Sequence, residues 1–229
     1  MRQKNRVRSA VPALQLREQA LYRSFTDALL LLAENGSPLG AYLEFGVSGG
    51  SSFICMHRAS SDLGLTTMPL IGFDSFQGLP TEAASTEERV WYPGQFKSSV
   101  GATRARLTSQ GIDWTRSFLV EGWFEDTLSG RPQAMAGVEA ASVVMFDCDL
   151  YSSTKLALAF VTPLIHDLAV LFFDDWKFAG LDEKNLGEKK AFSEYLSAHP
   201  ELTASSLRPY SDDSYVCLLT RRGEESALR

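Results

Sequence analysis

Cysteine is scarce in this 229-residue sequence, and the three cysteines do not form a recognisable site. Cys55, Cys148 and Cys217 lie far apart and show none of the spacings of a metal-binding motif. Two of them fall within or at the end of apolar segments that look like strands. We therefore expect reduced, buried thiols and a cytoplasmic location.

Long apolar segments are also missing. Four basic residues lie among the first eight, but no apolar stretch of about 7–15 residues follows them, as a signal peptide requires. The longest apolar region, 156–176, is interrupted by Pro163, His166 and Asp167, whereas a membrane span needs roughly 18 apolar residues without interruption. The sequence predicts a soluble protein that is neither exported nor held in a membrane.

Positive charge is in deficit. There are 22 lysines and arginines against 28 aspartates and glutamates, so the formal net charge is -6. This balance disfavours nucleic acid as the principal partner. Hydrophobic residues make up 45% of the chain, which is enough for the core of one α/β domain of this size.

No repeat or low-complexity linker divides the chain. We expect one main domain over residues 41–222, preceded by an N-terminal helical segment over 1–40 and followed by a short tail over 223–229. The N-terminal segment would form a lid, a contact between subunits or simply a packing layer. A homo-oligomer, a dimer or larger, is expected.

The stretch 143–154, VVMFDCDLYSST, joins a buried strand to two acids. Four apolar residues precede Asp147 and Asp149. The segment 169–176, AVLFFDDW, repeats this pattern, and the residues between the two segments have helical spacing. The resulting β-α-β unit would bring both strand ends to the edge of the sheet where open α/β sheets bind ligands.

Four aspartates at one edge of the sheet would repel one another. The second segment adds Asp174 and Asp175 to the first pair. Two unit charges ~5 Å apart repel by roughly 3 kcal/mol at an effective dielectric of about 20, so the cluster needs a cation or raised pKa values. Oxygen ligands favour a hard divalent ion, Mg²⁺ before Ca²⁺. Alternatively, Asp149, Ser152 or Ser153 caps the next helix, although one cap leaves the other acids unexplained.

Apolar periodicity predicts an α/β fold with seven strands in a mostly parallel, Rossmann-like sheet covered by helices on both faces. Strands are expected over 42–46, 69–73, 117–120, 143–146, 169–173, 202–210 and 215–221. The last two would form a C-terminal antiparallel hairpin. Helices are expected over 14–33, 53–58, 97–110, 156–166 and 184–196, with the first lying across the sheet edge.

The first strand runs into a glycine-rich turn, Glu44-x-Gly46-x-x-x-Gly50. Glycines allow the backbone to approach a ligand closely, and the following helix offers free N–H groups to a nucleotide-like molecule. Ser48 stands where a dinucleotide fingerprint requires glycine, which weakens an NAD-binding interpretation. Asp74 ends the second strand and is placed either to bind a ribose diol or to form an Asx turn.

Two further segments belong to the same sheet edge. Residues 75–95 are long and rich in turns, and are interpreted as an active-site flap in which Trp91 and Tyr92 stack on substrate or anchor the flap. Gly122 and Trp123 follow the third strand, where they would border an adenine, or Trp123 would lie in the core. None of the three histidines is placed as a catalytic base.

Five loops together resemble the macrocin O-methyltransferase family, namely LEFGVSGGSS, GFDSFQGLP, GWFEDTL, DCDLYSST and FFDDW. Members of this family are metal-dependent enzymes that use S-adenosylmethionine to methylate deoxysugar hydroxyls in antibiotic biosynthesis. The resemblance covers residues 42–176 and implies a class I methyltransferase fold. Cys148 is a departure, because glycine is the more familiar residue between the two aspartates.

The resemblance implies a role for each residue of the site. Glu44, Gly46, Ser51 and Asp74 would hold S-adenosylmethionine, with Gly122 and Trp123 near its adenine. Asp147, Asp174 and Asp175 would bind Mg²⁺. Asp149 would be the general base, and the partner would be a small molecule that bears a deoxysugar. If the DCD segment stays extended, the Cα atoms of its two aspartates lie ~6.5–7 Å apart, too far for both to bind one ion tightly.

Three alternatives remain open. In the first, the protein is still an O-methyltransferase, but its acceptor is a catechol or another vicinal diol. The protein would otherwise be a nicotinamide-dependent oxidoreductase, which the missing dinucleotide fingerprint disfavours. A nucleotide-binding protein without catalysis is the third alternative, and the intact acid cluster argues against it.

Overall fold

The computed structural model describes residues 15–36, 38–86, 89–130 and 132–221. The beginning of the expected N-terminal segment, 1–14, and the expected tail, 223–229, lie outside these residues. Seven strands form one sheet: β1 (Ala41–Phe45), β2 (Leu70–Asp74), β3 (Ser117–Glu121), β4 (Ala141–Phe146), β5 (Leu168–Phe173), β6 (Leu202–Leu207) and β7 (Tyr215–Arg221). Their order is β3-β2-β1-β4-β5-β7-β6.

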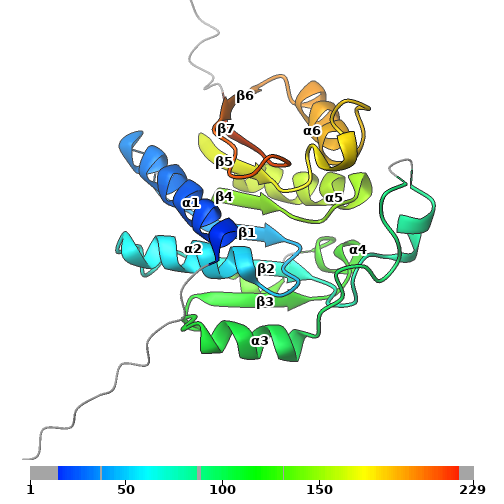
Figure 1. The fold of residues 1–229 in the computed structure, drawn as a ribbon. Coiled ribbons are helices and arrows are strands. Elements are labelled where there is room, and N and C mark those ends of the chain that lie inside the picture. The colour runs from blue at the N-terminus through cyan, green and yellow to red at the C-terminus, as the bar shows by residue number, and fades with distance from the viewer. Residues whose placement is uncertain (1–14, 37, 87–88, 131, 222–229) are drawn as a thin grey trace, which may run out of the picture.

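The sheet confirms the predicted fold class. The first five strands are parallel, and β7 pairs antiparallel with both β5 and β6, as expected for a C-terminal hairpin. The parallel strands point toward the right-hand side of Figure 1, where the loops that follow them gather. Parallel strands are buried on both faces, and β1 and β4 accordingly consist of fully buried residues.

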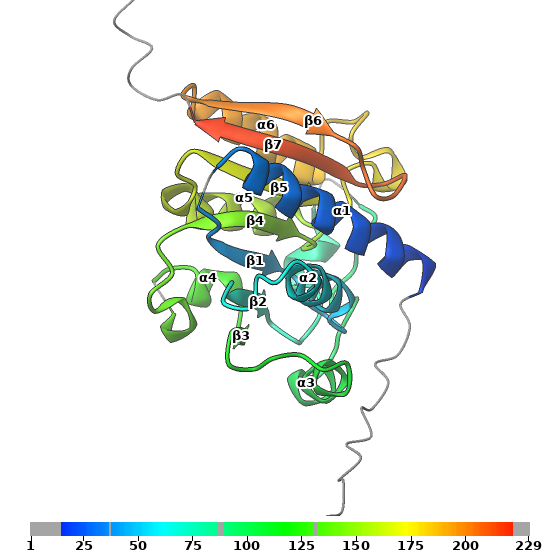
Figure 2. The ribbon, with the colours of Figure 1, turned by 90° about the vertical axis from the view of Figure 1, so that its left-hand side faces the viewer.

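Helices cover both faces of the sheet (Figure 2). The α-helices are α1 (Leu16–Glu34), α2 (Ser51–Asp62), α3 (Val100–Ser109), α4 (Phe124–Thr127), α5 (Tyr151–Val161) and α6 (Gly187–Ala198). Short 3-10 turns are η1 (Thr81–Ala84), η2 (Gln133–Met135), η3 (Thr162–Leu164) and η4 (Phe178–Gly180). One core lies between the sheet and α1 and α2, and the other between the sheet and α5 and α6. No described helix combines the length and apolar composition needed to cross a membrane.

The position predicted for the first helix is wrong. Instead of lying across the sheet edge, α1 packs on the face of the sheet against α2, β4 and β5. Its Phe25 is fully buried and meets Tyr42 and Phe172 edge-on, with ring centroids 5.6 Å and 4.7 Å apart. The aromatic residues of β1 and β5 provide a larger apolar surface than the sheet edge does, so the helix is part of the core.

Several helix beginnings also differ from the prediction, those of α5 and α6 among them. Helix α5 begins at Tyr151, five residues before the expected 156. The prediction placed the beginning too late because the first turn of the helix is polar and shows no apolar periodicity. Leu150 occupies the N-cap position, and no side chain caps the helix there, so the alternative of a capping aspartate or serine is wrong. Helix α6 begins at Gly187 rather than at 184.

A row of stacked rings crosses the centre of the sheet. The phenylalanine row consists of Phe73, Phe45, Phe146 and Phe173, one residue from each of β2, β1, β4 and β5. Neighbouring rings are 5.1, 5.7 and 4.8 Å apart between centroids and nearly parallel, and all four side chains are fully buried. The same residues are paired in the sheet register, which aligns the ends of the four strands.

We predict that Phe25→Ala lowers the free energy of unfolding by about 3–5 kcal/mol, because it leaves a cavity between α1 and the sheet. Leu30→Ala, at a 44% exposed position of the same helix, should change it by less than about 0.5 kcal/mol. Urea titrations of the two variants and the parent provide the measurement. An equally small effect of both substitutions would show that α1 is not part of the core.

Candidate active site

A cavity of about 680 Å³ opens at the carboxyl ends of the parallel strands. The residues that directly follow the phenylalanine row are Gly46, Asp74, Asp147 and Asp174, and all four line the cavity. They lie at one level because the strand register aligns the residues that precede them. Eight of the ten residues predicted for the site line this cavity, and only Glu44 and Ser51 do not.

Three aspartates form the acidic centre of the cavity, namely Asp147, Asp174 and Asp175. One carboxylate oxygen from each lies within 4.8 Å of the others, a grouping that would suit a metal ion. Burial raises the pKa of Asp147 well above its usual value, and the charges of Asp174 and Asp175 raise it further. Burial, followed by the charge of Asp174, raises the pKa of Asp175 to about 7. Their identity as metal ligands stays a prediction.

Asp149 adopts a different backbone conformation from the one expected. Its φ is +63°, so the DCD segment is not extended and the distance argued from extended geometry does not apply. The side chain is largely buried and forms a hydrogen bond with Asp175. Burial raises its pKa well above the usual value, and the charge of Asp175 adds to this. Cys148 is buried in the core on the α5 side.

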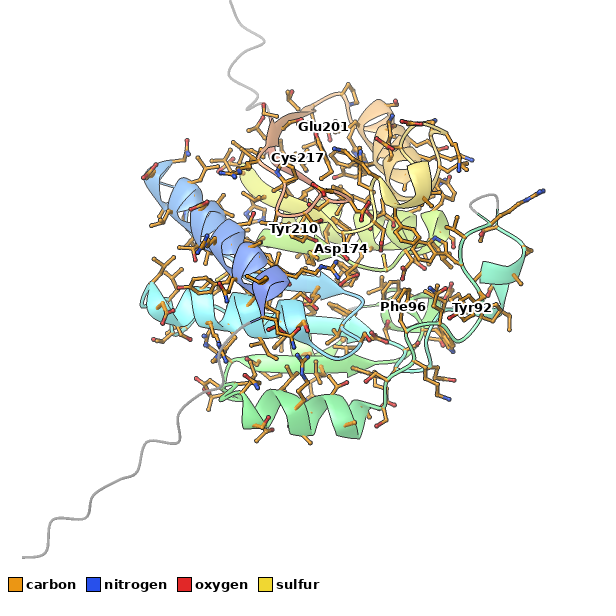
Figure 3. All side chains as sticks on the ribbon, viewed as in Figure 1. Tyr92, Phe96, Asp174, Glu201, Tyr210 and Cys217 are labelled. Atoms are coloured by element: carbon orange, nitrogen blue, oxygen red, sulfur yellow. The ribbon has the colours of Figure 1, made fainter. Side chains whose placement is uncertain are left out.

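Two residues that sequence reasoning missed hold Asp174. The guanidinium of Arg17, in the first turn of α1, donates to both carboxylate oxygens at 2.8 and 2.6 Å. The hydroxyl of Tyr210, in the segment between β6 and β7, donates to one of the same oxygens. In Figure 3, Tyr210 and Asp174 lie next to each other near the end of α1. Neither residue belongs to a motif, so the sequence carried no signal for them.

A further buried acid, Glu188, contacts the acidic centre. Glu188, in the first turn of α6, is fully buried, and its Oε2 accepts a hydrogen bond from the backbone N–H of Asp175 at 3.1 Å. Burial raises its pKa well above the usual value, and the charges of Asp175 and Asp174 add to the effect. No sequence signal pointed to this residue either, because an acid in the first turn of a helix is ordinary.

Asp74 organises the glycine-rich turn. Its carboxylate accepts hydrogen bonds from the backbone N–H groups of Val47 and Ser48, both at 2.7 Å, and of Phe76 at 2.6 Å. The bond to Phe76 is the Asx turn considered as an alternative, so Asp74 has this structural role in any case. Gly46 has a φ of +89°, and a Cβ there would lie 1.7 Å from the carbonyl oxygen of Asp147. No other residue fits.

The two predicted cofactor residues outside the cavity wall have other contacts. Glu44 is fully buried and accepts hydrogen bonds from Ser52 at 2.5 Å and Tyr42 at 2.7 Å. Burial raises its pKa to about 8. Ser51 is exposed at the beginning of α2 and accepts a hydrogen bond from Arg106 at 3.1 Å. Glu44 therefore joins β1 to the first turn of α2, and Ser51 joins that turn to Arg106 of α3.

The flap closes one side of the cavity. Backbone hydrogen bonds join Leu79 to Gln95 and Gly94 to Leu79, so the two ends of the flap lie together. Trp91 is buried and stacks on Phe178 with ring centroids 4.8 Å apart, which makes it the anchor of the flap. No histidine is among the described residues that line the cavity.

Solved structures share this fold. The O-methyltransferase NovP superposes with a TM-score of 0.71 at 20% identity, covering 89% of this chain and 80% of its own. The structure of CalS11, described as a TDP-rhamnose 3'-O-methyltransferase of calicheamicin biosynthesis, superposes with a TM-score of 0.55 at 25% identity, covering 91% of this chain and 79% of its own. The predicted class I methyltransferase fold is thereby confirmed.

Sequence comparison gives a more specific result. A curated relative from Streptomyces olivaceus, 8-demethyl-8-(2,3-dimethoxy-alpha-L-rhamnosyl)-tetracenomycin-C 4'-O-methyltransferase, is 29% identical over 143 residues. The match covers 60% of this chain and about half of the relative, 53% of its length. The family model for macrocin-O-methyltransferase (TylF) matches residues 17–189, which include the acidic centre, the glycine-rich turn and the flap. The chain belongs to the macrocin-O-methyltransferase family.

Proposed function

We propose that this protein is an S-adenosylmethionine-dependent O-methyltransferase that acts on a hydroxyl of a sugar-bearing small molecule and requires a divalent cation. The observation that carries the proposal is the grouping of the acidic centre, Asp149 and the glycine-rich turn in one cavity. Family membership supports methyl transfer over the nicotinamide-dependent alternative. The rhamnosyl group in the name of the curated relative supports a sugar acceptor.

The cofactor would lie along the glycine-rich turn. Gly46 permits close approach of a ligand to the backbone, and Asp74 holds the turn in place and would meet the ribose diol. Gly122 and Trp123 line the same cavity after β3, where an adenine would fit. Glu44 and Ser51 would act indirectly, by holding the beginning of α2 behind the turn.

The acidic centre fits a hard divalent cation such as Mg²⁺. Its three residues offer only oxygen ligands. Burial raises the pKa of Asp147 and of Asp175, and the charges of neighbouring aspartates add to the effect, as expected for carboxylates without sufficient counter-charge. A cation bound there would lower the pKa of a nearby acceptor hydroxyl and favour the ionised form of the surrounding carboxylates. Glu188 and Tyr210 would hold Asp175 and Asp174 in position.

Asp149 is the proposed general base. Its carboxylate would accept the proton of the acceptor hydroxyl as the hydroxyl oxygen bonds to the methyl carbon, and the methyl–sulfur bond breaks to leave S-adenosylhomocysteine. The side chain already lies against Asp175 at the cavity wall, close to the acidic centre. Holding the hydroxyl between these groups supplies the proximity on which such a reaction depends.

A direct test is incubation of the full chain with S-adenosylmethionine, Mg²⁺ and a panel of glycosides, catechols and other vicinal diols, followed by mass spectrometry for one added methyl group. Methylation of a glycoside is expected, and its loss with excess EDTA would support the metal requirement. Full turnover of metal-free protein would exclude that requirement. The cytoplasmic location and the homo-oligomeric state remain predictions, to be tested by fractionation and light scattering.

Asp149→Asn should lower kcat by about 10²–10⁴, because the amide does not accept the proton. Its affinity for Mg²⁺ and for S-adenosylhomocysteine should stay unchanged, since an amide still forms a hydrogen bond with Asp175. Asp147→Asn is the matched variant and should weaken Mg²⁺ binding. Rates measured by mass spectrometry and calorimetric titrations separate the two effects. Loss of Mg²⁺ affinity in Asp149→Asn but not in Asp147→Asn would reverse the assignment.

The metal-free protein should lose stability as the pH rises from about 5 to about 8. In the folded state the pKa values of Asp175 and Glu44 are raised to about 7 and about 8, so unfolding releases protons in this range. Each of these carboxyl groups contributes its full stabilisation at pH values below its pKa in the unfolded chain. This contribution is lost as the pH rises through the pKa of the group in the folded protein. Urea titrations at both ends of the range, with EDTA or Mg²⁺, measure the change.

Mg²⁺ should restore stability at the upper pH, because its positive charge balances the negative charge of the ionised aspartates in the acidic centre. Glu44→Gln serves as the control, since it removes a buried acid that lies outside the cavity and should leave the Mg²⁺ effect intact. A metal-free protein whose stability increases over the same pH range would contradict the assignment of raised pKa values.

A further inference from the structure

Arg17 is the single cation among the described residues that line the cavity. Its Nη2 donates to both carboxylate oxygens of Asp174, at 2.8 and 2.6 Å. The rest of the charge on the wall is negative, because eight carboxylates line the cavity, from Asp74, Glu125, Asp147, Asp149, Asp174, Asp175, Asp212 and Asp213. An anion that enters the cavity therefore finds one positively charged side chain on the described wall.

The cofactor brings such an anion, the carboxylate of its amino-acid part. Under the proposed function the adenine lies by Gly122 and Trp123 after β3, and the ribose meets Asp74 after β2. The strand order β3-β2-β1-β4-β5 then places the amino-acid part toward the ends of β1 and β4, next to Asp174 at the end of β5. A carboxylate among so many others is unfavourable without a cationic partner. Arg17 is the described side chain that supplies one.

The first turn of α1 is fixed beside the glycine-rich turn, while the side chain of Arg17 stays accessible. Glu18 accepts a hydrogen bond from Arg106 at 3.1 Å, and Arg106 also donates to the carbonyl oxygen of Gly49. The side chain of Arg17 is 70% exposed, whereas that of Asp174 is 9% exposed. Rotation about the side-chain bonds of Arg17 therefore redirects its guanidinium without moving the helix.

A cation at the acidic centre would weaken the pair between Arg17 and Asp174. Asp174 is one of the three proposed ligands, and Tyr210 already donates to the carboxylate oxygen Oδ1 that Arg17 also contacts. A divalent cation on the same carboxylate would repel the guanidinium and occupy lone pairs that now accept its hydrogen bonds. Arg17 then needs another anion, at the point where the cofactor carboxylate needs a cation.

We propose that Arg17 exchanges partners: it pairs with Asp174 while no cation is bound, and with the carboxylate of S-adenosylmethionine once a divalent cation occupies the acidic centre. The inference rests on the proposed function and adds an energetic coupling between its two ligands. The cation releases the guanidinium that the cofactor uses, so each ligand strengthens the binding of the other. Linkage requires the two effects to be equal in size.

Calorimetric titrations of the full chain without acceptor test the proposal, and no turnover is needed. The probes are S-adenosylmethionine and decarboxylated S-adenosylmethionine, which differ in the carboxylate, each with Mg²⁺ or with EDTA. We expect Mg²⁺ to strengthen binding of S-adenosylmethionine to the parent by about five- to fiftyfold. The decarboxylated compound should gain less than about twofold, because it offers Arg17 no anion.

Arg17→Gln should abolish the effect of Mg²⁺ on S-adenosylmethionine and leave binding of the decarboxylated compound unchanged. Arg17→Lys keeps the charge and should retain part of the effect. Arg23→Gln is the matched control, since it removes the same charge from an exposed position of the same helix outside the cavity wall. Mg²⁺ should bind to cofactor-free Arg17→Gln at least as tightly as to the parent, because a competitor for Asp174 is gone.

An effect of Mg²⁺ that is equal for the two compounds, or that persists in Arg17→Gln, would overturn the proposal. Weaker Mg²⁺ binding in cofactor-free Arg17→Gln would overturn it too, because Arg17 would then only position Asp174 for the cation. These results leave the proposed methyltransferase function intact. Failure of S-adenosylmethionine to bind the parent under any of the conditions would contradict that function itself.

Discussion

Stacking of the phenylalanine row across four parallel strands is the interaction on which the rest of the site depends. Each ring is fully buried, and the residue directly after each ring lines the cavity. A slip of one residue in any strand would turn its ring to the opposite face and move its cavity residue out of line. The apolar core therefore sets the level at which Gly46, Asp74, Asp147 and Asp174 meet, although none of them contributes to that core.

Repulsion between the carboxylates of the acidic centre destabilises the arrangement that the packing imposes. Carboxylates placed this close are unfavourable unless they hold protons, an ion pair or a cation. Burial, and after it the charge of Asp174, raises the pKa of both Asp147 and Asp175. Arg17 supplies one counter-charge from α1, a helix that also packs its Phe25 into the core. Helix α1 thus links the two parts of the structure: its apolar face adds to the core, and its first turn reaches the acidic centre.

Local patterns explain why much of this was predictable. Each parallel strand is a short apolar run, and the acids follow the runs directly, so strand ends and the residues Asp147, Asp174 and Asp175 were visible in the sequence. The contacts that complete the site are not local. Arg17 lies 157 positions from Asp174 and Tyr210 lies 36 positions from it, and no periodicity or motif connects residues so far apart. The polar first turn of α5 likewise carried no helical pattern.

The backbone conformation of Asp149 could not be predicted from the sequence either, and it directs the two aspartates of DCD differently. An extended chain would have directed both side chains to the same side of the strand. The φ of +63° instead turns Asp149 toward Asp175. This conformation is disfavoured for most residues with a Cβ, and aspartate tolerates it better than most. Glycine would relieve the strain but would remove the carboxylate. A strained residue that keeps its acid, beside three acids that suit a metal ion, supports the proposal that this acid takes part in the reaction.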